Sequence, residues 1–139
     1  MTAPRPDSEA AWITHLHRSG YLLASTRVPA EMVDGTIRVS RVGGTRPNLV
    51  QDAPKMLVEV WHADAFAASE LAHDIAEALE VPDGTWLDDT TKASNVITTG
   101  PFEFPDPSSA LKRYQFTFDS LVRRVGNRTT GAQQGRITP

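Results

Sequence analysis

Histidines and one pair of adjacent carboxylates are the side chains whose types could support catalysis or metal binding in this sequence. His15 and His17 stand two residues apart in a stretch of helical pattern, so they point to different sides and cannot chelate one ion together. His62 and Asp64 could place two ligands close together at a strand end, but Asp64 is better explained as a helix N-cap. The ligand spacings that mark zinc sites are absent from the sequence. The histidines therefore predict no metal site.

Nucleophile and phosphate-binding motifs are also absent. No serine stands in a Gly-x-Ser-x-Gly turn, and no glycine-rich phosphate loop precedes a lysine. The run GGTR at residues 43–46 leads into Pro47 and not into a helix N-terminus that could hold an anion. Asp88 and Asp89 lie in a polar stretch, where solvated acids are the ordinary reading. With no cysteine available as nucleophile or metal ligand, the sequence predicts that the protein is not an enzyme and uses no cofactor.

Length and composition favour one small domain. A chain of 139 residues buries roughly 70% of its unfolded surface without disulfides. No run approaches the roughly 20 apolar residues that span a bilayer, and the first residues do not have the pattern of a signal peptide. We expect a soluble intracellular domain with no membrane partner. We also predict a flexible segment at residues 1–7, a folded domain at 8–125 and a flexible tail at 126–139.

The charge is unevenly distributed along the chain. Residues 112–139 hold six basic residues and one acidic residue, whereas residues 1–111 hold eight basic and sixteen acidic residues. This uneven charge is typical of a protein whose two ends face different partners, although a basic tail that is simply solvated explains it equally well. Candidate contacts in this tail are Arg123, Arg124 and Arg128. No aromatic residues are interleaved with them, so the tail offers no platform for stacking bases.

Two helices are predicted from capping residues and apolar spacing. The first covers residues 8–18, and the second covers residues 65–80 with Asp64 as its cap. The buried stripe of the second helix is Ala68, Leu71, Ala72, Ile75 and Leu79. Its opposite surface carries Glu70, Asp74 and Glu77, which are either simply solvated or bind a basic partner.

Strands are predicted at residues 36–42, 55–61, 94–98 and 113–122, the last with the clearest alternation. The Asp34-Gly35 turn suggests that Arg27 and Val28 pair back across a hairpin. Residues 43–54 and 100–109 are expected to be long loops marked by proline. The order of elements predicts an α+β fold, a single domain with an antiparallel-rich sheet and two packed helices. Across that sheet, Arg38 is expected to pair with Glu59.

The two loops and their flanking strands carry a family resemblance. The run NLVQDAP at residues 48–54 leads into LVEVW at 57–61 and then into an alanine-rich helix. The run GP at 100–101 is followed by FPDP at 104–107 and RYQFT at 113–117. Over residues 36–124 this pattern resembles the tail terminator proteins of long-tailed (siphovirus-type) phages infecting actinobacteria.

The resemblance implies a structural virion protein. Tail terminators of this kind form a homo-hexameric ring on the completed tail tube, stop tube polymerisation and give the head connector, or neck protein, a docking surface. DNA passes through the ring without specific binding. The expected location is the top of the virion tail, at the head–tail interface, after assembly in the host cytoplasm.

Candidate contact residues follow from this resemblance and from the residue types. The candidate ring or partner interface is Arg46, Asn48, Asp52, Phe102, Phe104 and Asp106. The candidate lumen-facing acids are Glu70, Asp74 and Glu77, which would repel DNA phosphates. For Phe102 and Phe104 the alternative is that both rings fold back onto the chain's own core.

Two other functions remain open at this stage. A head-completion or neck connector protein would also form a ring, between portal and tail. A monomeric binding module would instead use an exposed sheet edge to capture a partner strand.

Overall fold

The computed structural model describes residues 6–126 of the chain. Two helices and seven strands follow one another in the order α1 (Ser8–Arg18), β1 (Ala24–Ser25), β2 (Thr36–Thr45), β3 (Gln51–His62), α2 (Ala65–Leu79), β4 (Thr85–Trp86), β5 (Thr91–Thr98), β6 (Phe102–Glu103) and β7 (Lys112–Arg124). The strands form one sheet in the order β1-β2-β3-β7-β5-β4, and β6 also pairs with β7. The predicted α+β fold with an antiparallel-rich sheet and two packed helices is confirmed.

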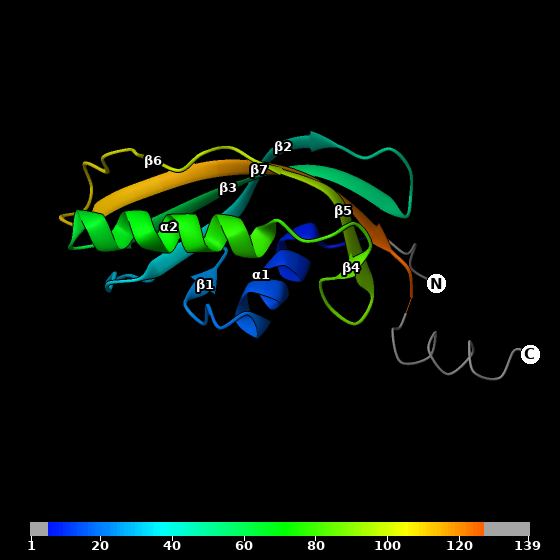
Figure 1. Ribbon diagram of the computed structural model, residues 1–139, viewed down its shortest axis with the longest axis horizontal. Coiled ribbons are helices and arrows are strands. Elements are labelled where there is room, and N and C mark those ends of the chain that lie inside the picture. Colours follow the sequence, from blue (N-terminus) through cyan, green and yellow to red (C-terminus); the bar gives the residue numbers. More distant parts are fainter. Residues whose placement is uncertain (1–5, 127–139) are drawn as a thin grey trace, which may run out of the picture.

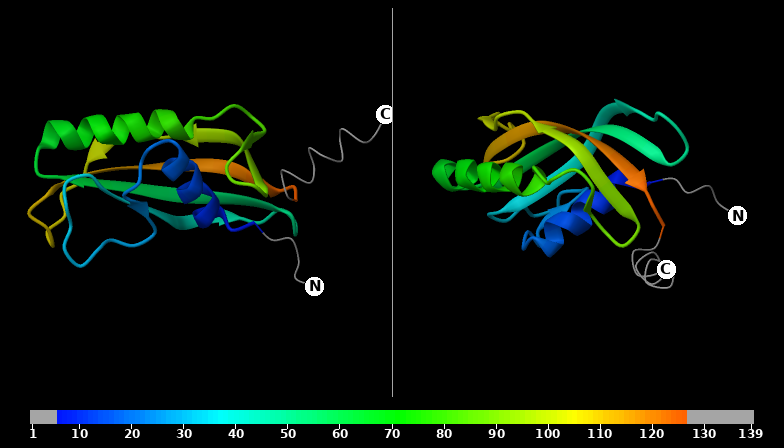
Figure 2. Two further views of the ribbon diagram at one scale, coloured as in Figure 1. Left: turned by 90° about the horizontal axis from the view of Figure 1, so that it is seen from below. Right: turned by 45° about the vertical axis from the view of Figure 1, so that its right-hand side comes forward.

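Both helices lie on the same side of the curled sheet, as Figure 1 and the turned views in Figure 2 show. The opposite sheet face carries no helix within residues 6–126. Successive side chains of the central strands point alternately toward the helices and toward the opposite face of the sheet. Met56, Val58 and Val60 of β3 and Phe116 and Phe118 of β7 point toward the helices and are fully buried. Each such side chain contributes roughly 1.5–3 kcal/mol through burial.

The helices begin and end close to where the sequence predicts. Asp7 caps α1 by accepting a hydrogen bond from the Ala10 N–H, and Asp64 caps α2 by accepting from Phe66 and Ala67. Trp12 of α1 enters the core and meets Phe118 edge to face, with ring centroids 5.0 Å apart. Neither helix in the described part of the chain is long and apolar enough to cross a membrane.

The expected hairpin around Asp34-Gly35 is wrong. The short strand β1 lies at Ala24–Ser25 and runs parallel to β2, while Arg27 and Val28 belong to a loop. The turn residues are instead tied to the end of β3. The Asp34 carboxylate accepts from the Ala63 N–H at 2.8 Å, and the Gly35 N–H donates to the Trp61 carbonyl at 2.9 Å. A tertiary contact has replaced the local turn that the dipeptide favours.

The long loop expected at residues 43–54 is also wrong, because most of it forms a hairpin between β2 and β3. Gly43 and Gly44 continue β2 after a register shift, and Gly44 pairs with Pro54. Gly44 has φ +103°, and a Cβ there would overlap the carbonyl oxygen of Ala53. Glycine is therefore needed for two strands to approach here, and does not mark a loop.

Candidate functional site

Two surfaces at opposite ends of the sheet contain or adjoin the candidate interface residues, with the exception of buried Asp52. The first surface is here called the aromatic pad and consists of Phe102, Phe104 and Arg113. The rings of Phe102 and Phe104 are 49% and 48% exposed and meet edge to face at 6.1 Å. Neither ring belongs to the buried core cluster. The alternative prediction, that both rings fold back onto the core, is therefore wrong.

Within the aromatic pad, Arg113 holds the loop that carries Phe104. Its Nε donates to the Phe104 carbonyl at 2.9 Å, and its Nη2 donates to the Pro105 carbonyl at 3.2 Å. The guanidinium carbon lies 5.1 Å from the centroid of the Phe104 ring, which is a cation–π distance. A planar fork of donors can hold two carbonyls and a ring in one geometry, which an ammonium group cannot do.

The Arg113 guanidinium is held in turn by a buried carboxylate. Glu59 of β3 is 2% exposed and accepts from Arg113 Nη1 at 3.2 Å and from Arg38 Nε at 2.7 Å. The predicted Arg38–Glu59 pair is therefore confirmed, and its carboxylate is buried. Glu59 therefore links Arg38 to Arg113, and through Arg113 it supports the aromatic pad.

Asp106 also ties the loop after the pad to the sheet. Its Oδ2 accepts from the Trp61 indole N–H at 3.0 Å, and its Oδ1 accepts from the Ser108 hydroxyl and N–H. The Ser108 hydrogen bonds, with smaller contributions from Trp61 and the charge of Arg113, lower the pKa of Asp106. This carboxylate therefore stays ionised beside the pad at neutral pH.

The second surface is the tip of the β2–β3 hairpin, residues 46–50, here called the hairpin tip. Leu49 is 68% exposed at its apex. Asn48 shapes the turn, since its Oδ1 accepts from the Val50 N–H at 3.0 Å and its Nδ2 donates to Gln51 Oε1 at 2.7 Å. Arg46 is exposed and forms no ion pair with another described residue.

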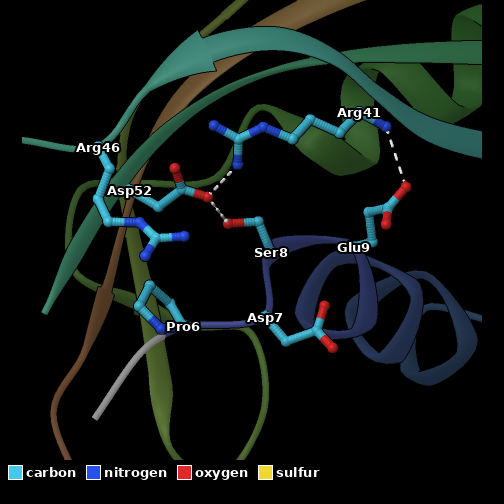
Figure 3. A pocket seen from close by; sticks show the side chains of 7 residues that line it. All are labelled: Pro6, Asp7, Ser8, Glu9, Arg41, Arg46 and Asp52. Atoms are coloured by element: carbon cyan, nitrogen blue, oxygen red, sulfur yellow. Dashed lines mark hydrogen bonds and ion pairs between the residues drawn. The ribbon is translucent and has the colours of Figure 1, made fainter. Parts of the chain in front are cut away.

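Asp52 lies behind the hairpin tip and is buried, unlike the other candidates at this end. Figure 3 shows its carboxylate between β3 and the start of α1, where Oδ2 accepts from the Ser8 hydroxyl at 2.6 Å and from Arg41. Glu9 adds a second link, because its Oε2 accepts from the Arg41 backbone N–H at 3.0 Å. The open pocket around these groups has a volume of about 330 Å³ and also contains the Arg46 side chain. Asp52 thus joins α1 to the hairpin and presents no carboxylate surface to a partner.

Electrostatics keeps Asp52 ionised despite its burial. Burial alone raises the pKa of this carboxyl, but the hydrogen bonds from Arg41 and Ser8 and the charges of Arg41 and Arg46 outweigh it and lower the pKa. Its Oδ1 is buried and has no hydrogen-bond partner among the described residues. The group is held chiefly by its other oxygen.

The aromatic pad and the hairpin tip lie far apart in one molecule. Along β7, Arg113 pairs with Trp61 at the pad end, and Arg123 pairs with Gln51 at the hairpin end. Ten residues of strand separate these positions, or about 33 Å at the usual rise. Figure 1 shows the β2–β3 tip and the loop that follows β6 at opposite ends of the long axis.

The remaining candidates lie on solvent-exposed positions or outside the described residues. Glu70, Asp74 and Glu77 are all exposed on the surface of α2 that faces away from the core. Arg123 and Arg124 are exposed at the end of β7, where the Arg124 N–H donates to the Val50 carbonyl at 2.9 Å. Arg128 and most of the tail predicted at 126–139 lie outside the described residues, as do the first five residues of the segment predicted at 1–7.

The histidines take part in structural contacts. His15 Nε2 bonds with the Ala78 carbonyl and His17 Nε2 with the Ala24 carbonyl, both at 2.8 Å, so the two rings point to different elements as predicted. His62 Nδ1 accepts from the Asp64 N–H at 3.0 Å. Within residues 6–126 no cluster of three or more histidine or acidic side chains is arranged to hold a metal ion.

Among the residues that support the two surfaces, the sequence predicted the Arg38–Glu59 pair but not the roles of Arg113, Ser8 and Arg41. Glu59 gave one signal, since it is the single charged residue in an otherwise apolar strand segment, LVEVW. Arg113, Ser8 and Arg41 gave none, because their partners are distant in sequence. Comparison with protein-family models and with curated proteins finds no match to this chain.

Proposed function

We propose that this chain is a phage tail terminator, a structural ring protein that caps the completed tail tube. In this role it stops tube polymerisation and gives the head connector a docking surface at the top of the virion tail. DNA passes through the ring without specific binding. The sequence resemblance over residues 36–124 supports the proposal.

The observation that carries the ring assignment is the placement of two unlike exposed surfaces at opposite ends of one sheet. A closed ring needs heterologous contacts, in which one patch on each copy meets a different patch on the next. The aromatic pad and the hairpin tip are such a pair of patches, one aromatic and one that contains an exposed leucine and an exposed arginine. Six copies in the ring is what the family resemblance implies.

The polar chemistry of the described residues also favours a structural role. Glu59 and Asp52, the two buried carboxylates, are each engaged by arginine and hold elements together. His15 and His17 bond to backbone carbonyls and brace α1 against its neighbours. These groups are used in building the domain, which supports a non-enzymatic protein.

The test is to mix the purified protein with tail tubes and, separately, with DNA-filled heads. A terminator caps tube ends and limits their length, which electron microscopy measures directly. Binding to filled heads without any effect on tubes would favour the head-completion or neck connector alternative. A chain that stays monomeric and alters neither particle would contradict both assembly roles.

The monomeric binding module keeps one observation in its favour. Beyond Ile37 and Arg38, which pair with β1, the outer edge of β2 has no strand partner among the described residues. This edge could accept an extended peptide. However, the Arg41 N–H on it is already bonded to Glu9, and a bulge follows between Arg41 and Gly43. Both features oppose strand addition, so the ring assignment is preferred.

A further inference from the structure

We propose that the aromatic pad of one copy receives the hairpin tip of a second copy, in a head-to-tail contact. This inference rests on the proposed ring function and names the two surfaces that meet in it. Phe102 and Phe104 supply the receiving surface, and Leu49 and Arg46 of the neighbouring copy supply the inserted groups.

The pad is organised before any partner arrives. Arg113 holds two carbonyls of the loop and the Phe104 ring, and Glu59 holds Arg113 from the sheet. Asp106 anchors the following residues to Trp61. Because these contacts order the Phe104 ring, which in turn meets the Phe102 ring edge to face, binding at the pad loses little side-chain entropy. Two half-exposed phenylalanines fixed in this way are suited to a contact with another protein surface.

The hairpin tip complements the pad in charge and in apolar character. Leu49 is 68% exposed, and the segment from residue 42 to residue 51 contains arginine at position 46 and no acid. At the pad, Asp106 is an ionised carboxylate, and the one negative charge of buried Glu59 is shared between Arg113 and Arg38. The ionised carboxylate and the exposed rings both attract a guanidinium group.

Cation–π stacking is already used once in the pad, and one ring remains for a second. Arg113 lies over Phe104, whereas Phe102 has no cation over its ring among residues 6–126. The guanidinium of Arg46 from another copy, which lies in the pocket beside Asp52 within a single molecule, turns outward to take that place, while Leu49 packs beside the two rings. The contact then combines apolar burial with a charge that fixes its orientation.

Only two copies can bring the tip and the pad together. Phe102 pairs with Gln115, and Gln51 at the base of the tip pairs with Arg123, so eight residues of β7 separate the two positions. That spacing is about 26 Å along a strand that lies within one sheet. Any covalent link between the tip and the pad must therefore join different molecules.

The absence of cysteine from the chain allows a direct cross-linking test. Cysteines are introduced by Pro47→Cys at the tip and Glu103→Cys beside the pad, both exposed positions that leave Leu49 and the two rings intact. A short bifunctional maleimide is added to the full-length protein at high concentration. The matched control combines Glu103→Cys with Leu22→Cys, an exposed position (75%) on the loop between α1 and β1.

The proposal expects a ladder of cross-linked species for the tip–pad variant and none for the Leu22 control. Mixing the two single-cysteine variants is expected to give cross-linked dimers and no longer species, because each copy then carries one reactive end. Leu49→Ser is expected to weaken self-association about tenfold, and Leu22→Ser is expected to leave it unchanged. No ladder, or equal ladders for both pairs, overturns the contact.

This experiment separates the contact from the proposed function. A tip–pad ladder formed by protein that fails to cap tail tubes would preserve the contact and remove the terminator role. Capping of tubes by protein that gives no tip–pad ladder would preserve the role and place the ring contact elsewhere.

Discussion

Arg113 on β7 donates from Nη1 to the buried carboxylate of Glu59 on β3, with the two atoms 3.2 Å apart. The same guanidinium reaches outward to the carbonyls of Phe104 and Pro105. A single side chain therefore links the interior of the sheet to the aromatic pad on its surface. Changes at Glu59 are expected to affect both the stability of the fold and the geometry of the pad.

Replacing Glu59 with glutamine should destabilise the domain by about 3 kcal/mol, because two arginines lose their buried counter-charge. Denaturation by urea measures the free energy of unfolding. The matched control is Asp119→Asn, which removes a carboxylate on β7 whose partner Lys55 is exposed. That change should stay within about 0.5 kcal/mol of the parent chain. Equal effects of the two substitutions would contradict the supporting role of Glu59.

Replacing Gly44 with alanine should disturb the β2–β3 hairpin. The backbone there has φ +103°, which costs an L-residue about 1–2 kcal/mol, and the added Cβ would also meet Ala53 and Pro54. Gly43→Ala is the control, since a Cβ at Gly43 would lie 3.8 Å from the Lys55 Cβ, an ordinary contact distance. Thermal unfolding should show a lower Tm for the first variant only. A Gly44→Ala protein as stable as the parent would show that the hairpin relaxes without cost.

Stability should fall in acid partly through Asp52. Its pKa is lower in the folded chain than in the unfolded chain, because its hydrogen bonds to Arg41 and Ser8 and the nearby positive charges outweigh the opposing effect of burial. The stabilisation is complete above the unfolded pKa of about 4 and is lost as pH falls through the folded pKa. Asp52→Asn should lower stability at neutral pH by about 2 kcal/mol and flatten the acid limb of the stability profile.

Asp89→Asn is the control for this pH dependence, because Asp89 lies in an exposed pair with Arg18. Asp106, whose pKa is also lowered, remains in both variants and keeps part of the acid limb. Urea denaturation at a series of pH values measures the effect. An unchanged acid limb in Asp52→Asn would show that the lowered pKa of Asp52 does not govern acid stability.

Replacing both Phe102 and Phe104 with serine should leave a folded monomer that no longer forms rings. The rings lie outside the buried core, so circular dichroism and Tm should change little. Self-association should weaken at least about thirtyfold, as expected when central aromatic contacts are removed. Light scattering and negative-stain imaging measure the assembly state. An unfolded product, or rings of normal abundance, would refute the assignment of these residues to the interface.

Neutralising the acids on α2, by Glu70→Gln, Asp74→Asn and Glu77→Gln together, should leave ring formation intact. All three side chains are exposed, and removing like charges at helical spacing stabilises the helix by a few tenths of a kcal/mol. If these acids line the DNA passage, the variant ring should retain duplex DNA more strongly than the parent ring at low salt. Co-sedimentation measures this difference. Equal DNA retention, or a ring with α2 on its outer wall, would overturn the lumen assignment.

Sequence patterns predicted the elements whose stability is local. Asp64 caps α2 as expected, and the two-residue alternation of Tyr114, Phe116 and Phe118 matches the buried side of β7. Capping and alternation depend on neighbours a few residues apart, so they can be read from the chain directly. The same local rules misled at residues 43–54, where glycine and proline stand within paired strands and not in a loop.

The sequence by itself determined the two helices, the apolar stripe of the second helix and the clearest strand, and it left open whether Phe102 and Phe104 are exposed or fold back onto the core. Only the tertiary structure decided that Asp52 is buried against Ser8 and that Glu59 holds Arg113. It also decided that the pad and the hairpin tip lie at opposite ends of one sheet. The two hydrogen-bonded pairs join residues 44 and 54 positions apart in the chain, and such pairing depends on which strands become neighbours. Local preferences of single residues carry no information about that choice.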